Sequence, residues 1–199
     1  MTTYKPLAQH LGWRILETRY LYRSPWHHLR QDRIRLPNGE LITYTYQEHA
    51  GFVAIVPVTT SADIVLIRTY RYTVDDWVLE IPAGGLGNRP GQPLLQVAQE
   101  ELAEEVGGIA EHWEYIDWFY TANGTTNAVG HLFLATDVEL TQAPRRENTE
   151  VMEIVRLPVE EVLMMARSGR IRDGESAMAL MRLETRLREI ENHARRSGR

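Results

Sequence analysis

Residues 99–107 read Gln-Glu-Glu-Leu-Ala-Glu-Glu-Val-Gly, and this is the most informative stretch of the chain. It carries four carboxylates in six residues, with no Lys or Arg among them. Apolar residues recur at helical spacing just upstream, so we expect a helix that ends at Gly107. On that helix Glu101 and Glu105 share one face, and Glu104 lies one step round from both.

This acidic face has two interpretations. Like charges at these spacings cost only about 0.2–0.5 kcal/mol per pair, so the face can be an ordinary solvated surface. Alternatively, the carboxylate oxygens hold a hard cation such as Mg²⁺ or Mn²⁺, which acts mostly on phosphate substrates. Replacing Glu101 or Glu105 by Gln is expected to relieve repulsion and leave the fold intact or slightly more stable.

Short strands precede this helix, and strands followed by helices come after it. Pro37-Asn38-Gly39 is typical of a hairpin turn between two of the early strands. We expect strands at 13–20, 30–36, 41–47, 51–58, 63–69, 77–81, 115–120, 129–136 and 151–157, and helices from 92 or 93 to 106, at 159–167 and at about 175–191. A long loop is expected at 82–91. This order predicts an α+β fold, with a mixed sheet flanked by helices and a small N-terminal antiparallel β subdomain.

Composition excludes several classes of function. The 199 residues include no Cys, which removes disulfides, thiolate metal sites and Cys nucleophiles. The net charge of −5 gives no general attraction to nucleic acid or to an anionic membrane. No stretch approaches the roughly 18 apolar residues of a membrane span, and the N-terminus lacks the apolar core of a signal peptide. We therefore expect a cytoplasmic protein without nucleic-acid or membrane partners.

The segment from Leu79 to Gly107 resembles the Nudix hydrolase box. The family pattern is Gly, five residues, Glu, seven residues, then Arg-Glu-aliphatic-x-Glu-Glu-x-Gly. The Glu-Ile-Pro-Ala-Gly at 80–84 is similar to the ADP-ribose pyrophosphatase branch. Three further segments resemble that branch in the same order: 36–39, 65–72 and 150–158. The resemblance covers about residues 12–190 and implies a Nudix-type α/β/α sandwich.

The resemblance implies a metal site. Glu101 and Glu105 would bind Mg²⁺, with Mn²⁺ as the alternative, and Glu104 would be a further ligand or would support the ligands. The backbone carbonyl of Ala83 would be an additional ligand. Such ions neutralise a diphosphate, orient it and lower the pKa of an attacking water.

The resemblance also implies substrate and catalytic residues. Arg71 would contact phosphate, although a salt bridge at the strand edge is the structural alternative. Gly84 would line the substrate site, and Trp26, beside a Pro in a turn, would stack on the nucleobase. The general base would be Glu150, with Glu147 in the same polar loop as its competitor.

The box departs from the family pattern at two positions. Gln92 replaces the first Glu, Glu100 replaces the Arg, and seven residues instead of five separate Gly84 from Gln92. In the family that Arg and that Glu help to hold the loop against the helix. Two functions therefore stay open: Mg²⁺-dependent hydrolysis of ADP-ribose or a related nucleoside diphosphate sugar, or a catalytically weak Nudix-fold sensor or regulator that binds a nucleotide. The sequence does not rank ADP-ribose against GDP-mannose.

Two domains are expected. Residues 1–48 would form the β subdomain that mediates dimerisation and base binding, and residues 49–199 the Nudix hydrolase domain. The first segment is too short and too aromatic to cover its own apolar face, and the related enzymes exchange their N-terminal strands. We therefore expect a homodimer whose ligand is a small nucleotide sugar.

Overall fold

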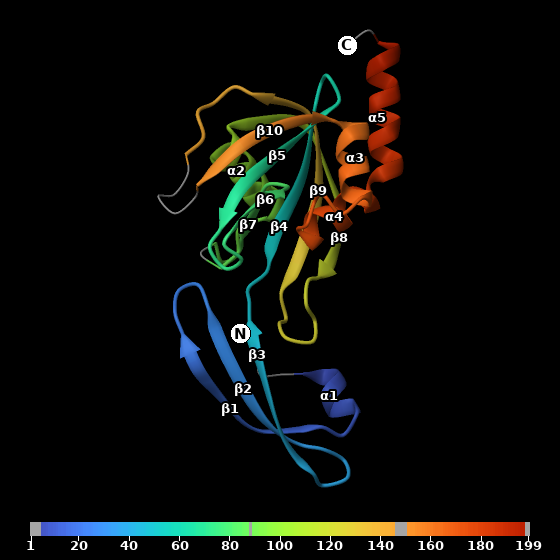
Figure 1. Ribbon diagram of the computed structural model, residues 1–199. Helices are drawn as coiled ribbons and strands as arrows, with labels where there is room; N and C mark the ends of the chain where they lie inside the picture. The colour runs from blue at the N-terminus through green and yellow to red at the C-terminus, as the bar shows by residue number, and fades with distance from the viewer. Residues whose placement is uncertain (1–4, 88, 146–150, 198–199) are drawn as a thin grey trace. The chain divides into compact units, whose positions relative to one another are not determined.

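A computed structural model describes residues 5–87, 89–145 and 151–197 of the chain (Figure 1). The chain divides into two compact units. The first contains Met1–Gly51 together with Tyr120–Val129, and the second contains Phe52–Phe119 and Gly130–Arg199. The loop at 120–129 thus packs with the N-terminal segment, an association that the sequence did not reveal.

The first unit is built on a three-stranded antiparallel sheet. Its elements are α1 (Pro6–His10), β1 (Arg14–Arg23), β2 (His28–Arg35) and β3 (Leu41–Glu48), in the sheet order β1-β2-β3. The expected turn joins β2 to β3, where the N–H of Gly39 donates to the carbonyl of Leu36 at 2.9 Å. Gly39 has φ +87°, a conformation that glycine adopts without strain. The short helix α1 was not anticipated.

A buried ion-pair network stabilises this small unit. The guanidinium of Arg30 is 1% exposed and donates to both carboxylate oxygens of Asp32 at 3.0 Å and to Glu48 at 2.9 Å. Tyr20 Oη donates to the other oxygen of Glu48 at 2.8 Å. Every charge is therefore paired, as burial in a low-dielectric interior requires.

The second unit contains a mixed sheet with the order β10-β5-β4-β9-β8. Its strands are β4 (Phe52–Thr59), β5 (Asp63–Arg71), β6 (Asp76–Glu80), β7 (Ala83–Gly85), β8 (Gly108–Tyr120), β9 (Val129–Leu140) and β10 (Met152–Pro158). β4 pairs in parallel with β9 and antiparallel with β5 and β7. β10 pairs with one edge of β5, and β6 pairs with the opposite edge, beyond the short contact with β4. The predicted mixed sheet is confirmed.

Helices cover both faces of this sheet. They are α2 (Leu94–Val106) on one face, and α3 (Val159–Arg167), α4 (Gly174–Arg182) and α5 (Glu184–Arg196) on the other (Figure 1). Alternate residues of β4 point to opposite layers, so Val53 and Ile55 pack with Leu102 of α2. Ala54 and Val56 pack with the core formed by α3, α4 and α5. The α/β/α sandwich is therefore confirmed.

Several expected boundaries differ in the structure, and three of the differences change an element. The expected final helix is in fact two helices that meet at Leu183. The sequence does not reveal the bend, because the apolar spacing of Leu180, Leu183 and Leu187 continues through it. β8 begins at Gly108, since an edge strand tolerates the exposed charged residues that made 108–114 look irregular. Part of the expected loop at 82–91 is the short strand β7.

Within the described ranges, none of the helices has the length and apolar character needed to cross a bilayer.

Candidate active site

The acidic face of α2 lies beside β7. α2 ends at Gly107, whose left-handed conformation, φ +66°, closes the helix as the sequence predicted. The Glu105 residue is 6% exposed, and its carboxylate accepts a hydrogen bond from the Ala83 N–H at 3.0 Å. Glu104 is more accessible, with 38% of its side chain exposed. The structure thus places two predicted ligand positions, one on β7 and one on α2, in direct contact.

Gly84 lies directly against the carboxylate of Glu101. A Cβ atom at residue 84 would be 1.8 Å from Cδ and 2.0 Å from Oε1 of Glu101. Any larger residue would therefore displace this carboxylate. The glycine of the box serves close packing between β7 and α2, and it leaves room beside Glu101.

Arg89 is a site residue that the sequence did not reveal. It lies in the loop between β7 and α2, and its Nη1 donates to Glu101 Oε1 at 2.5 Å. Its Nη2 donates to Glu104 Oε2 at 3.1 Å, and Nε lies 3.9 Å from Glu100. Arg89 therefore offsets part of the like-charge repulsion expected among the α2 glutamates. Substituting Glu101 would remove a charge-assisted bond, so a gain in stability no longer follows.

The altered box positions still contact each other. Gln92 Nε2 donates to Glu100 Oε2 at 2.7 Å, and Gln96 Nε2 donates to Glu100 Oε1 at 3.0 Å. The hydrogen bonds from Gln92 and then Gln96 lower the pKa of the Glu100 carboxyl. The contact between positions 92 and 100 is thus retained as an amide–carboxylate pair, and the nearby cation comes from Arg89.

Arg71 forms a two-bond ion pair with Glu80. Its Nε and Nη2 donate to the two carboxylate oxygens of Glu80 at 2.8 and 2.5 Å. The hydrogen bond with Glu80 raises the pKa of the Arg71 guanidinium. The salt-bridge alternative for Arg71 is therefore observed, yet 51% of its side chain stays exposed. The predicted phosphate contact remains a prediction.

Arg71 and Glu80 line a cavity of about 500 Å³ in the second unit. Ala83 lies in its wall, so the cavity reaches the residue that bonds Glu105. Charged residues from the start of α4 and the segment before it complete the wall: Arg172, Asp173 and Glu175. This cavity is large enough for part of a nucleotide and is adjacent to the box.

Glu175 is the carboxyl of this cavity with the largest change in acidity. Burial first, then the charges of Asp173 and Glu80, raise the pKa of Glu175 to about 7. Asp173 is fixed as the N-cap of α4, where it accepts from the N–H of Ser176 at 2.8 Å. Sequence reasoning missed Glu175, because its proximity to Glu80 depends on the packing of α4.

For three of the residues predicted from the sequence, the described part of the structure shows no contact with this site. Trp26 belongs to the first unit, in the turn between β1 and β2, and it is 67% exposed. Ser24 Oγ accepts hydrogen bonds from the N–H groups of Trp26 and His27 at 3.2 and 2.9 Å. Glu147 and Glu150 lie outside the described residues.

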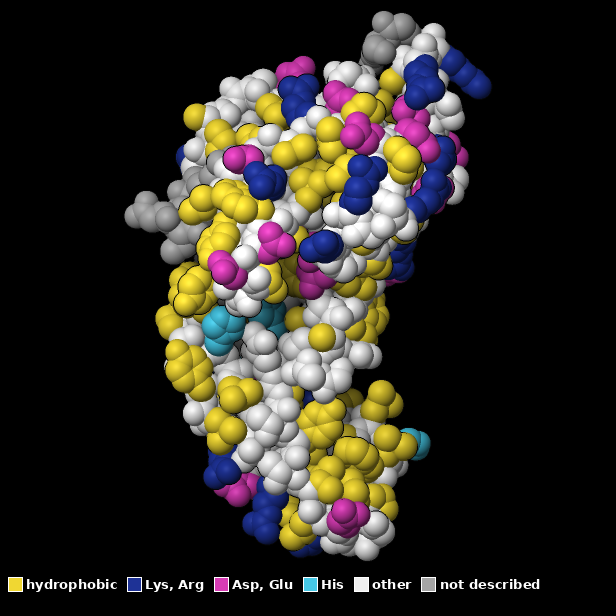
Figure 2. Space-filling model, viewed as in Figure 1, with side chains coloured by type: hydrophobic (Ala, Val, Ile, Leu, Met, Phe, Trp, Pro, Cys, Tyr) yellow, Lys and Arg dark blue, Asp and Glu magenta, His cyan; other side chains and the backbone are white. Residues whose placement is uncertain are grey.

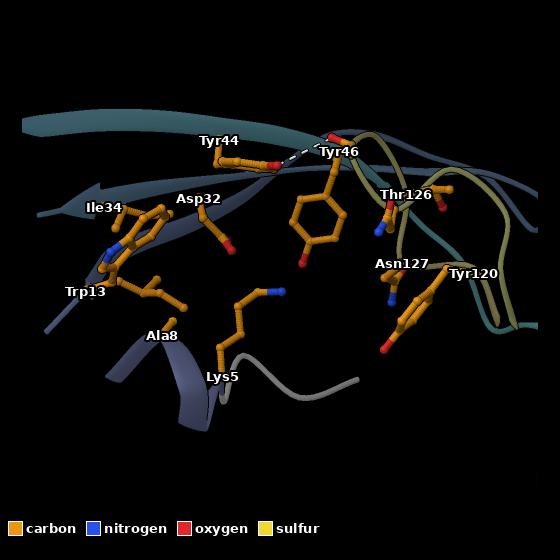
Figure 3. Close-up of a pocket in the computed structure, with 13 residues that line it drawn as sticks. Lys5, Ala8, Trp13, Asp32, Ile34, Tyr44, Tyr46, Tyr120, Thr126 and Asn127 are labelled. Carbon is orange, nitrogen blue, oxygen red and sulfur yellow. Dashed lines mark hydrogen bonds between the residues drawn. The ribbon is translucent and has the colours of Figure 1, made fainter. Parts of the chain in front are cut away.

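The first unit has a separate aromatic cavity of about 390 Å³ (Figure 3). Its wall includes Trp13, Tyr44, Tyr46 and Tyr120, with Asn127 from the 120–129 loop. Tyr46 is 8% exposed, and burial raises its pKa to about 12. Several aromatic residues of the first unit therefore line this cavity, whereas Trp26 is not among its lining residues.

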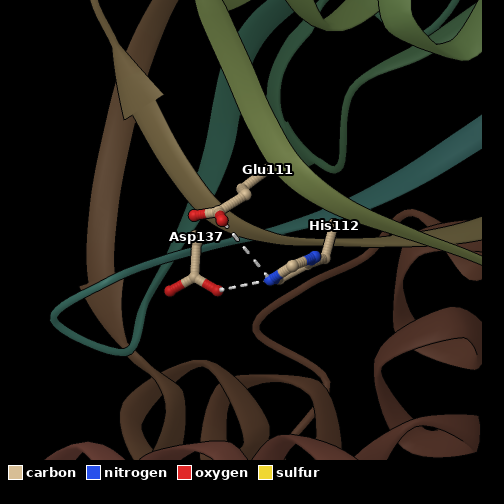
Figure 4. A group of neighbouring side chains, drawn as sticks. All are labelled: Glu111, His112 and Asp137. Carbon is tan, nitrogen blue, oxygen red and sulfur yellow. Dashed lines mark ion pairs between the residues drawn. The ribbon is translucent and has the colours of Figure 1, made fainter.

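A second group of potential metal ligands lies on β8 and β9 (Figure 4). His112 Nε2 is 3.9 Å from an oxygen of Glu111 and 3.9 Å from an oxygen of Asp137. Among the described residues, this is the group of three whose ligand atoms all lie within 4.8 Å of one another. Glu111 and His112 are exposed, and no further contact indicates a bound ion.

The box residues suit a hard divalent cation. The donors are carboxylate oxygens from α2, with backbone groups of β7 beside them, and Mg²⁺ and Mn²⁺ prefer oxygen ligands. The missing Cβ of Gly84 keeps the space next to Glu101 clear. Nothing in the donor set favours a soft metal.

Comparisons with known proteins agree with this geometry. A model described as the NUDIX domain matches residues 45–180, and one described as the nucleoside diphosphate sugar hydrolase N-terminal domain matches residues 13–47. An ADP-ribose pyrophosphatase of Bacillus subtilis (strain 168) is 30% identical over 152 residues, which are 76% of this chain and 81% of the relative. A methanol dehydrogenase activator of Bacillus methanolicus is 28% identical over 181 residues, 90% of this chain and 96% of the relative.

A solved structure shares the fold. It is described as the crystal structure of an ADP compounds hydrolase, and it matches with a TM-score of 0.76 at 22% identity, covering 89% of this chain and 95% of the other. The sandwich and the packing of Gly84 against Glu101 define an α/β/α domain whose acidic helix lies against a short strand. The chain belongs to the Nudix family. It is a Nudix pyrophosphohydrolase, a class that generally uses divalent metals.

Proposed function

We propose that the protein hydrolyses the diphosphate bond of ADP-ribose or a related nucleoside diphosphate sugar, giving a nucleoside monophosphate and a sugar phosphate. One observation carries the proposal: the Glu101 and Glu105 side chains are held against Gly84 and Ala83, beside a cavity lined by Arg71. The match to a nucleoside diphosphate sugar hydrolase N-terminal domain supports this substrate class. ADP-ribose comes first because a relative that shares most of the chain is named for it.

The metal ligands would be Glu101 and Glu105, with Glu104 and the carbonyl of Ala83 as further ligands. Mg²⁺ is our first choice and Mn²⁺ the alternative, because the donors are oxygens. A bound ion would supply charge neutralisation for the diphosphate and a more acidic water. The protein's own part is to fix the carboxylates, and the Ala83 N–H does so for Glu105.

Arg71 would bind the substrate phosphate. Its bonds to Glu80 fix the plane of the guanidinium, while half of the side chain remains accessible from the cavity. A guanidinium held in this way can offer its remaining N–H groups to phosphate oxygens without further ordering. Gly84 would line the same site, and Trp26 would stack on the base.

Glu150 would act as general base, with Glu147 as its competitor. A general base typically contributes about 10²–10⁴-fold, so Glu150→Gln should lower kcat by that factor with little change in KM. Glu147→Gln should cost less than about tenfold, because it would not accept the proton. Exchanged outcomes would make Glu147 the base.

The alternative is a catalytically weak protein that binds a nucleotide as a sensor or regulator. The amide–carboxylate pair of Gln92 and Glu100, and the guanidinium of Arg89 on Glu101, favour this reading of the altered box. A relative that spans nearly the whole chain is named an activator. This function would give nucleotide binding without turnover.

Product analysis separates the two. The protein is incubated with ADP-ribose and Mg²⁺, and the products are resolved by ion-exchange chromatography. Pyrophosphohydrolysis gives AMP and ribose 5-phosphate in equal amounts. Intact ADP-ribose with Mg²⁺ and with Mn²⁺, together with measurable nucleotide binding, would instead support the sensor.

We also propose that the protein acts in the cytoplasm as a homodimer.

A further inference from the structure

The carboxylates assigned to the metal already have a cation between them. Arg89 Nη1 contacts Glu101 Oε1 at 2.5 Å, and Nη2 contacts Glu104 Oε2 at 3.1 Å. Only 15% of the Arg89 side chain is exposed, and 12% of that of Glu101. A guanidinium with two charge-assisted bonds in a partly buried position is a strong local interaction.

The loop between β7 and α2 carries this contact. Arg89 lies on the loop after β7, where its N–H donates to the Leu86 carbonyl at 3.1 Å and its own carbonyl accepts from Gln92 at 3.3 Å. In the described ranges, Arg89 is the one basic residue with ion pairs to glutamates of α2. The cation that offsets the acidic helix is thus carried by a loop and not by the helix itself.

A divalent ion on the same carboxylates would be close to this guanidinium. Both cations would draw on Glu101 and Glu104, and their like charges would repel at short distance. The guanidinium therefore has to withdraw, at least from the oxygens that the ion takes. Loop attachment makes such a withdrawal feasible without moving α2.

We infer that Arg89 is an internal counter-cation of the box, which stabilises the metal-free protein and competes with the divalent ion for Glu101 and Glu104. This inference rests on the metal site of the proposed function. On this inference, Arg89 has opposite effects on two quantities, the stability of the metal-free protein and the affinity for the metal. Removing the guanidinium should weaken the metal-free fold and strengthen metal binding.

Metal binding without nucleotide tests the competition. Mn²⁺ is titrated into the full-length protein, and free Mn²⁺ is followed by electron paramagnetic resonance. Arg89→Gln should bind Mn²⁺ about three- to tenfold more tightly than the unsubstituted protein, the scale of one partly exposed ion pair. Arg89→Lys keeps the charge but cannot span both carboxylates, so its affinity should lie between the two.

Arg188 offers a matched control. It also bridges two glutamates, with Nη1 2.7 Å from Glu160 and Nε 3.2 Å from Glu184, on α3 and α5. Arg188→Gln should leave Mn²⁺ affinity unchanged. In EDTA, both Gln variants should melt below the unsubstituted protein, but saturating Mn²⁺ should raise Tm more for Arg89→Gln alone.

Glu101→Gln shows whether the ion measured is at the box and not at the group of Glu111, His112 and Asp137. If Glu101→Gln loses the ion while Arg89→Gln binds it with equal or lower affinity, Arg89 only holds the loop and the inference fails, although the metal site stands. If the unsubstituted protein and Arg89→Gln both bind Mn²⁺ no better than Glu101→Gln, the metal site and the inference fail together.

Discussion

At the scale of single residues, the charge balance of the site depends on which side chain neutralises the glutamates of α2. The sequence shows four carboxylates without a nearby base, whereas the structure supplies Arg89 from the preceding loop. Glu105 is buried and anchored by a backbone N–H, and Glu101 is held between Gly84 and Arg89. The local spacing of the glutamates predicts their shared face, but the partner of each one depends on the path of the loop.

The individual glutamates should differ sharply in catalysis. Glu101→Gln and Glu105→Gln should each lower turnover by at least about 10²-fold, the scale of losing one electrostatic stabiliser of the transition state. Glu100→Gln should be nearly neutral, because Glu100 is bonded to Gln92 and Gln96. Steady-state rates on ADP-ribose give the comparison. If Glu100→Gln were the most damaging, the assignment of the box register would be wrong.

Glu175 should make stability depend on pH. Its folded-state pKa of about 7 lies above its ordinary value of 4.5, so the folded protein favours the protonated form. The contribution of protonated Glu175 to the free energy of unfolding is complete below about pH 4.5. It is lost as the pH rises through 7, because the carboxyl must then ionise in the folded protein. Glu175→Gln escapes this loss, so its stability advantage should grow between pH 5 and pH 8, on the order of 1–3 kcal/mol.

Urea unfolding in EDTA at the two pH values measures this change. Glu139→Gln, at an exposed position on β9, is the control and should show no such growth. An equal difference between Glu175→Gln and the unsubstituted protein at both pH values would mean that Glu175 is not held in a charge-disfavouring environment.

At the scale of elements, the sequence predicted the helices and turns that follow local rules. It did not predict the features that depend on tertiary packing. The β2–β3 turn, α2 and its glycine end follow from local rules, and all three are in the structure. β7 and the start of β8 were missed, because a three-residue strand and a charged edge strand lack an apolar pattern. The bend at Leu183 was missed because the apolar spacing continues through it. Arg89 and Glu175 were missed for a related reason, because their positions at the site depend on the path of a loop and on the packing of α4.

The end of α2 gives a prediction at this scale. A Cβ at residue 107 would be 1.9 Å from the backbone oxygen of Gln142, and Gly107 also has φ +66°. Gly169 has a similar φ of +74° but nothing within 4 Å, so Gly169→Ala should cost only the backbone strain, about 1–2 kcal/mol. Gly107→Ala should cost at least about 1 kcal/mol more, because a backbone clash adds to the strain.

Urea midpoints of the two glycine variants measure the difference. Equal losses of stability would show that the segment around Gln142 yields freely and does not constrain the end of α2.

At the scale of the whole molecule, the first unit leaves much apolar surface uncovered. Hydrophobic side chains gather over this part of the surface in the view of Figure 2. The large hydrophobic residues of its three strands and of the turn between β1 and β2 that are exposed to solvent are Leu16, Leu21, Tyr22, Trp26, Leu29, Leu41 and Tyr44. Apolar surface of this extent on a small unit is typical of an interface between subunits.

We therefore expect a homodimer formed through the first unit. Sedimentation equilibrium at micromolar concentration should give about twice 23.0 kDa. Leu21→Glu together with Leu29→Glu should shift the mass toward the monomer, because buried charges oppose association. A monomer in the unsubstituted protein would remove the dimer and also any stacking of Trp26 on a substrate bound by the partner subunit.

The central claim is metal-dependent hydrolysis of a nucleoside diphosphate sugar, and phosphate release coupled to a phosphatase tests it most directly. The panel contains ADP-ribose, GDP-mannose and other nucleotide sugars, each with Mg²⁺ and with EDTA. We predict release from at least one of them with Mg²⁺, none with EDTA, and a loss of at least about 10²-fold in Glu105→Gln. Equal rates with Mg²⁺ and EDTA, or no release from any nucleotide sugar by a protein that binds them, would contradict it.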